Sequence, residues 1–315
     1  MTEKKEENKT RKEGMGIHLI KLDIDGTITG FDGVDDFETL NPKVERVIRL
    51  LSKDGHIVCL STGRNFHAAL PIYKQAGLST YLSTYNGAYI TNPSHSNSAV
   101  TMTFISNKIV KDILNENIIR KNLLNVLIDR DDLQILATGD DAHYKKVFFR
   151  GNPYLKNSYS QTLDLLGERN ALQVILEFPN EIVLINSVFA VLRKYRNAIG
   201  FYVEKKLKAE KVGDKILVPD SRYTTIRIHN RYASKGKGAE IIGSYYNISL
   251  ENTLAFGNEV NDIEIFRTVG KGIVTAGTDC AHYLRTLAYD VTSHEHKINS
   301  DGVAEFLINY FGYKV

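Results

Sequence analysis

Four short clusters of polar residues in this sequence carry side chains that could do chemistry together. They are the stretches Asp23–Thr27 (DIDGT), Ser61–Arg64 (STGR), Ser234–Gly236 (SKG) and Gly257–Asp262 (GNEVND). Three of them follow apolar runs typical of buried strands, and the SKG stretch opens a helix-like segment. In an open α/β sheet, ligands bind outside the carboxyl ends of the strands, so clusters at separate strand ends should converge. The sequence therefore predicts one shared site of carboxylates, hydroxyls, amides and a lysine.

The two carboxylates of the first cluster, Asp23 and Asp25, predict a site for a divalent cation. Residues two apart on an extended chain point to the same side, so both carboxylates lie at the end of one strand. Left alone they would repel and one would be protonated, whereas a divalent cation suits hard oxygen ligands and removes the repulsion. A solvated strand end would explain either Asp alone, but not the whole Asp-x-Asp-Gly-Thr string.

The elements that must position these clusters alternate between strand and helix. In the N-terminal part, the pattern predicts strands near 17–24, 56–60 and 81–85, a helix that starts at Asn41-Pro42 and ends before Gly55, and a helix over 65–76. The C-terminal third predicts helices over 235–246, 260–268, 278–287 and 302–310 and strands over 253–256, 272–275 and 288–292. This alternation implies right-handed βαβ crossovers and a parallel sheet covered by helices on both faces.

The middle of the chain has a different pattern, which predicts a separate α+β unit inserted into the parallel-sheet domain. It holds strand-like pieces at 99–105, 171–177, 216–218 and 224–228 and amphipathic helices near 107–124 and 180–197. We therefore predict a core made of 15–88 and 230–315 and an inserted domain over 89–229. The charged and polar segment 1–14 is predicted to be a disordered tail.

Composition limits the classes of function. The 315 residues include 40 Lys and Arg against 37 Asp and Glu, a net charge of +3, which argues against a nucleic-acid partner because such proteins carry a clustered basic excess. Two cysteines, Cys59 and Cys280, cannot make a disulfide framework, and no apolar run approaches the ~20 residues of a membrane span. The start of the chain resembles neither a signal peptide nor an anchor. We expect a cytoplasmic protein with no membrane partner.

The four clusters resemble the motifs of the haloacid dehalogenase (HAD) superfamily of phosphatases, in the order of that family and at workable spacings. LDIDGTI resembles its nucleophile motif, STGR its second motif, Lys235 in SKGKG its third and GNEVND its fourth. TYNGAYI at 84–90 and SDGVAEFL at 300–307 are similar to further signatures of the Cof-like branch, whose members carry a large inserted α+β cap. The resemblance covers about residues 15–315. It implies an α/β fold with a Rossmann-like parallel-sheet core and an inserted α+β cap domain.

The resemblance also implies a Mg²⁺-dependent phosphatase that hydrolyses small phosphomonoesters, with sugar phosphates as the first expectation. Asp23 would be the nucleophile that forms an aspartyl-phosphate, and Asp25 would protonate the leaving oxygen and then activate water. Donors aimed at the transferring phosphoryl group are commonly the largest contribution to such catalysis. The residues expected to bind this group are Thr62, Gly63, Lys235 and Asn261.

The Mg²⁺ ion is expected among Asp23, the backbone carbonyl of Asp25, Asn258 and, through a water, Asp262. The fourth motif departs here from the common family pattern Gly-Asp-Gly-x-Asn-Asp, because positions 258 and 259 are Asn and Glu. Asn258 still offers a carbonyl oxygen but removes one negative charge from the metal shell, so we expect weaker Mg²⁺ affinity. Glu259 as a substitute ligand stays open.

Three further residues are expected to orient the site. Arg64 either clamps a phosphate or holds the STGR loop in place, and the sequence favours neither role. Asn86 is expected to face the substrate at the junction of core and cap. Asp301 is expected to support Lys235 or its loop.

Two other polar features have simpler explanations. His294-Glu295-His296 lacks a third and fourth metal ligand nearby and is interpreted as a solvated loop. The basic run of Lys205, Lys206, Lys208 and Lys211 is interpreted as a solvated face.

Two alternatives to a phosphatase remain at this point. A sugar phosphomutase would use the same two Asp residues but release an isomeric sugar phosphate. A catalytically weak phospho-ligand binding or regulatory protein, suggested by Asn258 and Glu259, would bind without turnover. The sequence specifies neither the small phosphorylated metabolite nor the oligomeric state.

Overall fold

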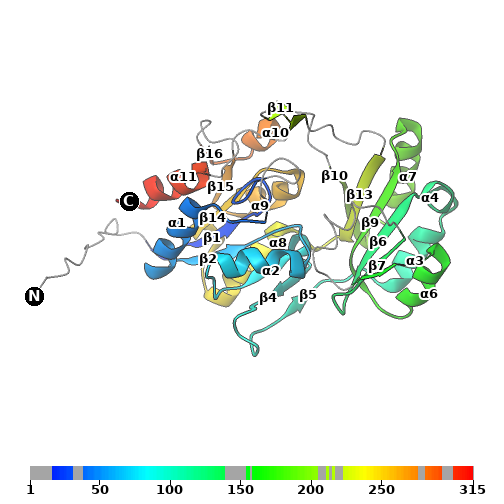
Figure 1. Ribbon diagram of the computed structural model, residues 1–315, viewed down its shortest axis with the longest axis horizontal. Helices are drawn as coiled ribbons and strands as arrows, with labels where there is room; N and C mark the ends of the chain where they lie inside the picture. Colours follow the sequence, from blue (N-terminus) through cyan, green and yellow to red (C-terminus); the bar gives the residue numbers. More distant parts are fainter. Residues whose placement is uncertain are drawn as a thin grey trace, which may run out of the picture.

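The computed structural model of the chain describes residues 16–30, 38–138, 154–156, 158–204, 211–212, 215–216, 223–275, 281–292 and 301–314. Figure 1 shows two units side by side, one around a parallel sheet and one around a mainly antiparallel sheet. Several sequence features lie outside the described residues: the tail 1–14, Cys280, the stretch 294–296 and the lysines Lys205, Lys206 and Lys208.

The first unit is built on five parallel strands in the order β16-β15-β14-β1-β2, which confirms the predicted α/β core. The strands are β1 (Leu19–Leu22), β2 (Ile57–Leu60), β14 (Thr253–Gly257), β15 (Lys271–Val274) and β16 (Asp290–Val291). The central strand β1 lies between β14 and β2. Three of the polar clusters follow these three neighbouring strands, so they meet at one edge of the sheet.

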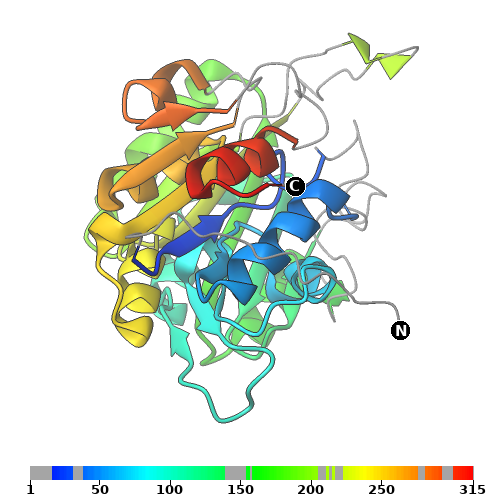
Figure 2. The same cartoon turned by 90° about the vertical axis from the view of Figure 1, so that its left-hand side faces the viewer.

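Helices cover both faces of this sheet, as the alternation predicts. One face carries α1 (Pro42–Lys53), α2 (Phe66–Gln75) and α11 (Asp301–Phe311), and Figure 2 shows α1 and α11 in front of the strands. The other face carries α8 (Lys235–Tyr246), α9 (Ile263–Thr268) and α10 (Ala281–Arg285). Period-two alternation in β1 sends Ile20 and Leu22 to the first face and Leu19 to the second.

Helix α1 begins and ends where its sequence signals place it. The side chain of Asn41 accepts hydrogen bonds from the backbone N–H groups of Lys43 and Val44, and Pro42 occupies the first turn. The chain leaves the helix at Asp54 and turns at Gly55, whose φ of +85° is easily reached only by glycine. The apolar residues spaced for one helical face are the buried ones: Val44, Val47, Ile48 and Leu51.

The strand expected near 81–85 does not join the parallel sheet as a regular strand. Instead β3 (Leu82–Thr84), β4 (Tyr89–Thr91) and β5 (Thr101–Met102) form an antiparallel sheet of their own, with β3 linked to the core by one bridge between Ser61 and Ser83. The reason is a tight turn over Tyr85–Gly87, where all three residues have positive φ and the chain reverses onto itself. Both β4 and β5 lie beyond the predicted boundary at residue 88, yet they pair with β3 or its neighbour.

The second unit, which we call the cap, has a six-stranded sheet in the order β10-β13-β9-β6-β7-β8. Its strands are β6 (Asn125–Arg130), β7 (Ile135–Ala137), β8 (Tyr154–Lys156), β9 (Ala171–Pro179), β10 (Ile199–Glu204) and β13 (Tyr223–Asn230). A short hairpin of β11 (Lys211–Val212) and β12 (Lys215–Ile216) accompanies it. Of these, the sequence pattern predicted β9, β12 and β13 and missed the others, because short strands such as β7 show too few residues for a period-two signal.

Among the described residues, helices cover one face of the cap sheet, and Figure 1 shows the other face turned toward the core. The helices are α3 (Asn107–Asn115), α4 (Asn117–Asn122), α6 (Tyr159–Leu166) and α7 (Ile182–Lys194). The single helix expected over 107–124 is broken at Glu116, whose ψ of 126° is not helical.

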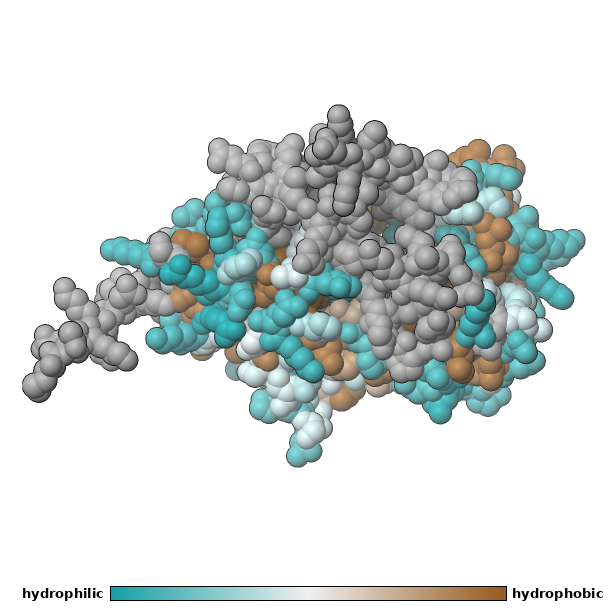
Figure 3. All heavy atoms as spheres, in the orientation of Figure 1, coloured by the Kyte–Doolittle hydropathy of each residue, from teal (hydrophilic) through white to brown (hydrophobic). Residues whose placement is uncertain are grey.

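The outer surface of the cap carries exposed apolar side chains at the start of α7. Ile182 and Val183 are 74% and 77% exposed, and Figure 3 shows hydrophobic colour over the cap end of the molecule, where α7 lies. Within the described part of the chain, we find no helix with the length and apolar character needed to span a membrane.

Lys21 is an unexpected residue in the core. It lies in the middle of β1 with no exposed surface, beside Ala255 and Cys59 of the neighbouring strands. Its Nζ has no hydrogen-bond partner among the described residues. Burial lowers the pKa of Lys21 to about 8; Cys59 opposes this shift and Lys235 adds to it. A desolvated amine without a partner should destabilise the fold.

We expect Lys21→Met to raise the free energy of unfolding by about 1–3 kcal/mol at pH 7. Methionine has a side chain of similar length and lacks the unsatisfied amine. The folded-state pKa lies below the unfolded value of 10.5, so the penalty is complete below about pH 8 and fades as the pH rises toward 10.5. Urea unfolding of both proteins at several pH values measures this gain. Lys74→Met on the exposed face of α2 is the control and should change stability by less than about 0.5 kcal/mol. A less stable Lys21→Met protein would contradict the prediction.

Candidate active site

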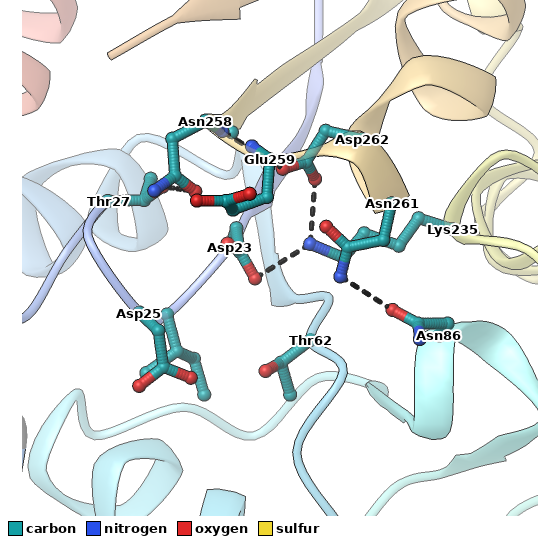
Figure 4. A network of polar contacts seen from close by, with 12 residues as sticks. Asp23, Asp25, Thr27, Thr62, Asn86, Lys235, Asn258, Glu259, Asn261 and Asp262 are labelled. Atoms are coloured by element: carbon teal, nitrogen blue, oxygen red, sulfur yellow. Dashed lines mark hydrogen bonds and ion pairs between the residues drawn. The ribbon is translucent and has the colours of Figure 1, made fainter. Parts of the chain in front are cut away.

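An ammonium group lies between two buried carboxylates at the carboxyl edge of the core sheet (Figure 4). The Nζ of Lys235 is 2.8 Å from Oδ1 of Asp23 and 2.7 Å from Oδ1 of Asp262. All three side chains have at most 7% of their surface exposed. Because burial removes the hydration of these charges, each one depends on the others for compensation.

The three charged residues come from separate parts of the chain. Asp23 follows β1, Lys235 is the first residue of α8, and Asp262 ends the 3₁₀ turn η4 (Val260–Asp262) that follows β14. The side chain of Ser234 caps α8, so the helix begins at Lys235 beside the strand ends. A Cβ atom on Gly257 would lie 2.3 Å from Cγ of Asp262. Glycine at the head of the fourth cluster therefore leaves the space that the Asp262 carboxylate fills.

The buried charges shift each other's pKa. Burial raises the pKa of Asp23 to about 7; the Lys235 ammonium opposes this shift, and the carboxylates of Asp262 and Asp25 add to it. Burial alone would lower the pKa of Lys235, but Asp23 and Asp262 outweigh it and hold that pKa above its usual value. Lys235 is therefore cationic, and a further cation beside Asp23 would favour its ionised form.

Asp25 is bound through both carboxylate oxygens by Arg64. Nε of Arg64 donates to Oδ2 at 2.9 Å and Nη2 donates to Oδ1 at 2.6 Å. The guanidinium also donates through Nη1 to the carbonyl oxygen of Ala68 in α2, and Arg64 is 8% exposed. Of the two roles expected for Arg64, these contacts favour the second, because the guanidinium ties the STGR loop to the DIDGT loop.

Of the predicted phosphate-binding residues, Thr62 lies near Asp23 in Figure 4, and Gly63 lies against two amide side chains. Oγ1 of Thr62 accepts the backbone N–H of Arg64 at 3.1 Å, which leaves the hydroxyl proton to be donated elsewhere. A Cβ atom on Gly63 would lie 3.2 Å from Oδ1 of Asn86 and 3.3 Å from Nδ2 of Asn261. Asn261 donates to Asn86 at 2.9 Å, so both amides pack closely over this glycine.

The donor set expected for Mg²⁺ converges at Asn258. One end of the Asn258 amide lies 3.2 Å from the Asp25 carbonyl oxygen and 3.2 Å from Oδ2 of Asp23. With nitrogen at that end, the amide donates to both; with oxygen there, three oxygens face one another, an arrangement that a hard divalent cation would stabilise. The residues present therefore fit Mg²⁺. Among the described residues, no group of three or more His, Cys, Asp or Glu side chains could hold a metal, so a cation here would rely on carbonyl and amide oxygens as well.

Asp262 has its contacts to Lys235 and to its own loop. Its Oδ2 accepts the backbone N–H groups of Asn258 at 2.9 Å and Glu259 at 3.0 Å. The Glu259 side chain in turn accepts the backbone N–H of Asp262, which closes a reciprocal cap on the turn. Any part of Asp262 in metal binding would therefore be indirect, through the loop that presents Asn258.

Asp301, the first residue of α11, contacts the start of α1. Its carboxylate accepts hydrogen bonds from Nδ2 of Asn41 at 3.0 Å and Nζ of Lys43 at 2.5 Å. These contacts tie the start of α11 to α1, against which α11 packs. The expected support of Lys235 or its loop by Asp301 stays a prediction.

Tyr202 was missed by sequence reasoning, although its hydroxyl lies at the site. It accepts a hydrogen bond of 2.9 Å from Nδ2 of Asn86, across a separation of 116 residues. Among 17 tyrosines its sequence neighbourhood carries no motif. Only the pairing of β10 within the cap and the placement of the cap against the core bring it there.

Comparisons with known proteins agree with this fold. A family model described as haloacid dehalogenase-like hydrolase matches residues 20–307. The 5-amino-6-(5-phospho-D-ribitylamino)uracil phosphatase of Bacillus subtilis is 26% identical over 297 residues, which are 93% of this chain and 97% of that protein. The HMP-PP phosphatase of Serratia proteamaculans is 22% identical over 265 residues, 81% of this chain and 82% of that protein.

Two solved structures share the fold at low identity. A haloacid dehalogenase-like hydrolase from B. subtilis has a TM-score of 0.71 at 19% identity, covering 92% of this chain and 99% of that one. A HAD subclass IIB sugar phosphatase has a TM-score of 0.68 at 17% identity, covering 94% of this chain and 99% of that one. With a family match that takes in both the core and the cap, the chain belongs to the haloacid dehalogenase-like hydrolases.

Proposed function

We propose that this chain is a Mg²⁺-dependent phosphatase that hydrolyses small phosphomonoesters, sugar phosphates foremost, through an aspartyl-phosphate on Asp23. The observation that carries the proposal is the buried contact between Asp23 and Lys235, with Thr62 near it (Figure 4). The names of the two curated relatives, both phosphatases of small phosphorylated molecules, support it. So does the sugar phosphatase among the structural neighbours.

In the first step, an oxygen of Asp23 attacks phosphorus and the bond from phosphorus to the ester oxygen breaks. Lys235 offsets the negative charge of the phosphoryl group, and Thr62 and the backbone N–H of Gly63 donate to its oxygens. Asp25 gives a proton to the leaving alcohol. Arg64 sets the orientation of Asp25 through the two hydrogen bonds seen in the structure.

In the second step, Asp25 takes a proton from water, whose oxygen attacks the aspartyl-phosphate. Phosphate leaves and Asp23 is regenerated, so one hard displacement is divided into two easier ones. Asn261, which donates to Asn86 through one amide proton, would donate the other to the phosphoryl group in both steps.

Asp23, the Asp25 carbonyl and Asn258 would hold Mg²⁺, with Asp262 behind them in the fourth cluster. When bound, the cation would offset negative charge on Asp23 and on the phosphoryl group.

A cytoplasmic location remains our expectation, supported by Cys59, a free and buried cysteine.

The proposal is tested by a phosphate-release screen over sugar, nucleotide and cofactor phosphates with a Mg²⁺ titration. We expect turnover that a chelator abolishes and Mg²⁺ restores, and that Asp23→Asn reduces by at least about 10³-fold because the nucleophile is lost. Release of an isomeric sugar phosphate in place of phosphate would indicate a mutase. Binding of phosphate esters without turnover at saturating Mg²⁺ would indicate a binding protein. Either result would contradict the phosphatase.

We expect Arg64→Lys to lower kcat about 10- to 100-fold with a smaller effect on KM, because lysine cannot hold both oxygens of Asp25 and the general acid is misplaced. Arg49→Lys is the matched control, since Arg49 contacts Glu45 on the exposed surface of α1. Steady-state kinetics on the best substrate of the screen measures both variants. Equal kcat values for wild type and Arg64→Lys would contradict the prediction that Arg64 orients Asp25.

Asn258→Asp should lower the Mg²⁺ concentration needed for half-maximal activity several-fold, because it adds a negative charge to the metal shell. The exposed Asn247→Asp serves as control for the added charge and should leave the Mg²⁺ dependence unchanged. An unchanged or higher Mg²⁺ requirement in Asn258→Asp would show that residue 258 does not limit metal affinity.

A further inference from the structure

The turn that follows β3 holds a backbone conformation that side chains other than glycine rarely adopt. Tyr85 and Asn86 have φ values of 50° and 55°, and Gly87 follows at 91°. Left-handed non-glycine residues cost free energy and persist where the surroundings hold them. Here the N–H of Tyr85 donates to the Arg64 carbonyl at 3.0 Å and that of Asn86 donates to the Thr62 carbonyl at 2.9 Å. The STGR loop thus holds the turn and presents the Asn86 side chain.

The Asn86 amide joins two parts of the molecule that the sequence separates widely. Its Oδ1 accepts from Nδ2 of Asn261 at 2.9 Å, and its Nδ2 donates to the hydroxyl of Tyr202 at 2.9 Å. Asn261 belongs to the fourth cluster of the core, whereas Tyr202 belongs to strand β10 of the cap. Figure 4 shows Asn86 and Asn261 pointing toward one another beside Lys235.

Asn261 depends on this amide for its orientation. Its Oδ1 is buried and has no hydrogen-bond partner among the described residues, so the bond from Nδ2 to Asn86 is the contact that holds the side chain. One of the two amide protons of Asn261 is used there, and the second is left to donate to a phosphoryl oxygen.

Tyr202 holds the Asn86 amide from the cap side. With the Tyr202 hydroxyl as acceptor for Nδ2, the amide oxygen is turned to Asn261. A hydroxyl can donate as well as accept, so the direction of the amide is set by the NH₂ group of Asn261, which needs an acceptor, and Tyr202 keeps the amide in place. Burial raises the pKa of Tyr202, so its hydroxyl stays protonated. Tyr202 lies opposite Arg227 of β13 in the cap sheet, so the paired strands hold its backbone in place.

We propose that Tyr202 is a positioning residue for phosphate binding: its hydroxyl holds Asn86 in place, Asn86 holds Asn261, and the contact of Tyr202 with Asn86 forms only when the cap lies against the core. The inference rests on the proposed function and adds a cap residue to the phosphate-binding machinery. It links the position of the cap to the orientation of the Asn261 amide, the hydrogen-bond donor in the core.

The test compares Tyr202→Phe with Tyr232→Phe, whose ring is 66% exposed and which serves as the matched control. Binding of inorganic phosphate in the presence of Mg²⁺ is measured by calorimetry, and KM and kcat are measured on the best ester of the screen. For Tyr202→Phe we expect phosphate affinity to fall about 3- to 10-fold and KM to rise by a similar factor, the effect of one neutral hydrogen bond, with kcat changed less than twofold. Tyr232→Phe should match wild type.

A double-mutant cycle separates positioning from direct contact. In an Asn86→Ala background, Tyr202→Phe should cause no further loss of phosphate affinity, because its effect passes through the missing amide. An equal loss with and without Asn86 would overturn the proposal and make Tyr202 a direct ligand contact. Unchanged phosphate affinity in Tyr202→Phe, whatever its thermal unfolding midpoint, would also overturn it. Because phosphate binding is read without turnover, failure of the phosphatase proposal would be seen separately.

Discussion

The candidate site depends on one buried ammonium group shared by two carboxylates. Lys235 touches Asp23 and Asp262, which follow different strands, so three segments must meet within hydrogen-bond distance. Removing one partner of a buried charge pair typically costs about 3–5 kcal/mol, because the other charge is left uncompensated. Close packing of α8 makes the meeting possible: a Cβ atom on Gly236 would lie 2.6 Å from Oγ1 of Thr268. The glycines around Lys235 therefore serve the electrostatics of the site.

A second constraint is the left-handed turn at Tyr85–Gly87, which connects this charge centre to the cap. A Cβ atom on Gly87 would lie 2.3 Å from the backbone oxygen of Ser234, so the turn packs directly on the N-cap of the helix that carries Lys235. The same turn reverses the chain and presents Asn86 between Asn261 and the cap. One local conformation thus sets the chain direction, the position of α8 and the contact of the cap with the site.

Much of the core could be predicted because its signals are local. A dozen residues or fewer contain each of these signals: the N-cap residue and apolar spacing of α1, the apolar runs of β1, β2 and β14, and the polar residues just after those strands. The strand near 81–85 was assigned to the wrong sheet because consecutive positive φ values at Tyr85 and Asn86 are not a sequence pattern. Most cap strands were missed because they are short or buried on both faces, and such strands lack clear alternation.

The sequence by itself determined which residues could form the site, since strand ends in a parallel sheet must share one edge. Only the tertiary structure decided what each of them contacts. In the folded chain, Arg64 binds Asp25 and Lys235 binds Asp262. Asp301 contacts Lys43 of α1, and Tyr202 contacts Asn86. The physical reason is that a motif specifies residue types along the chain, whereas a hydrogen bond or ion pair requires two side chains from distant segments to lie within about 3 Å.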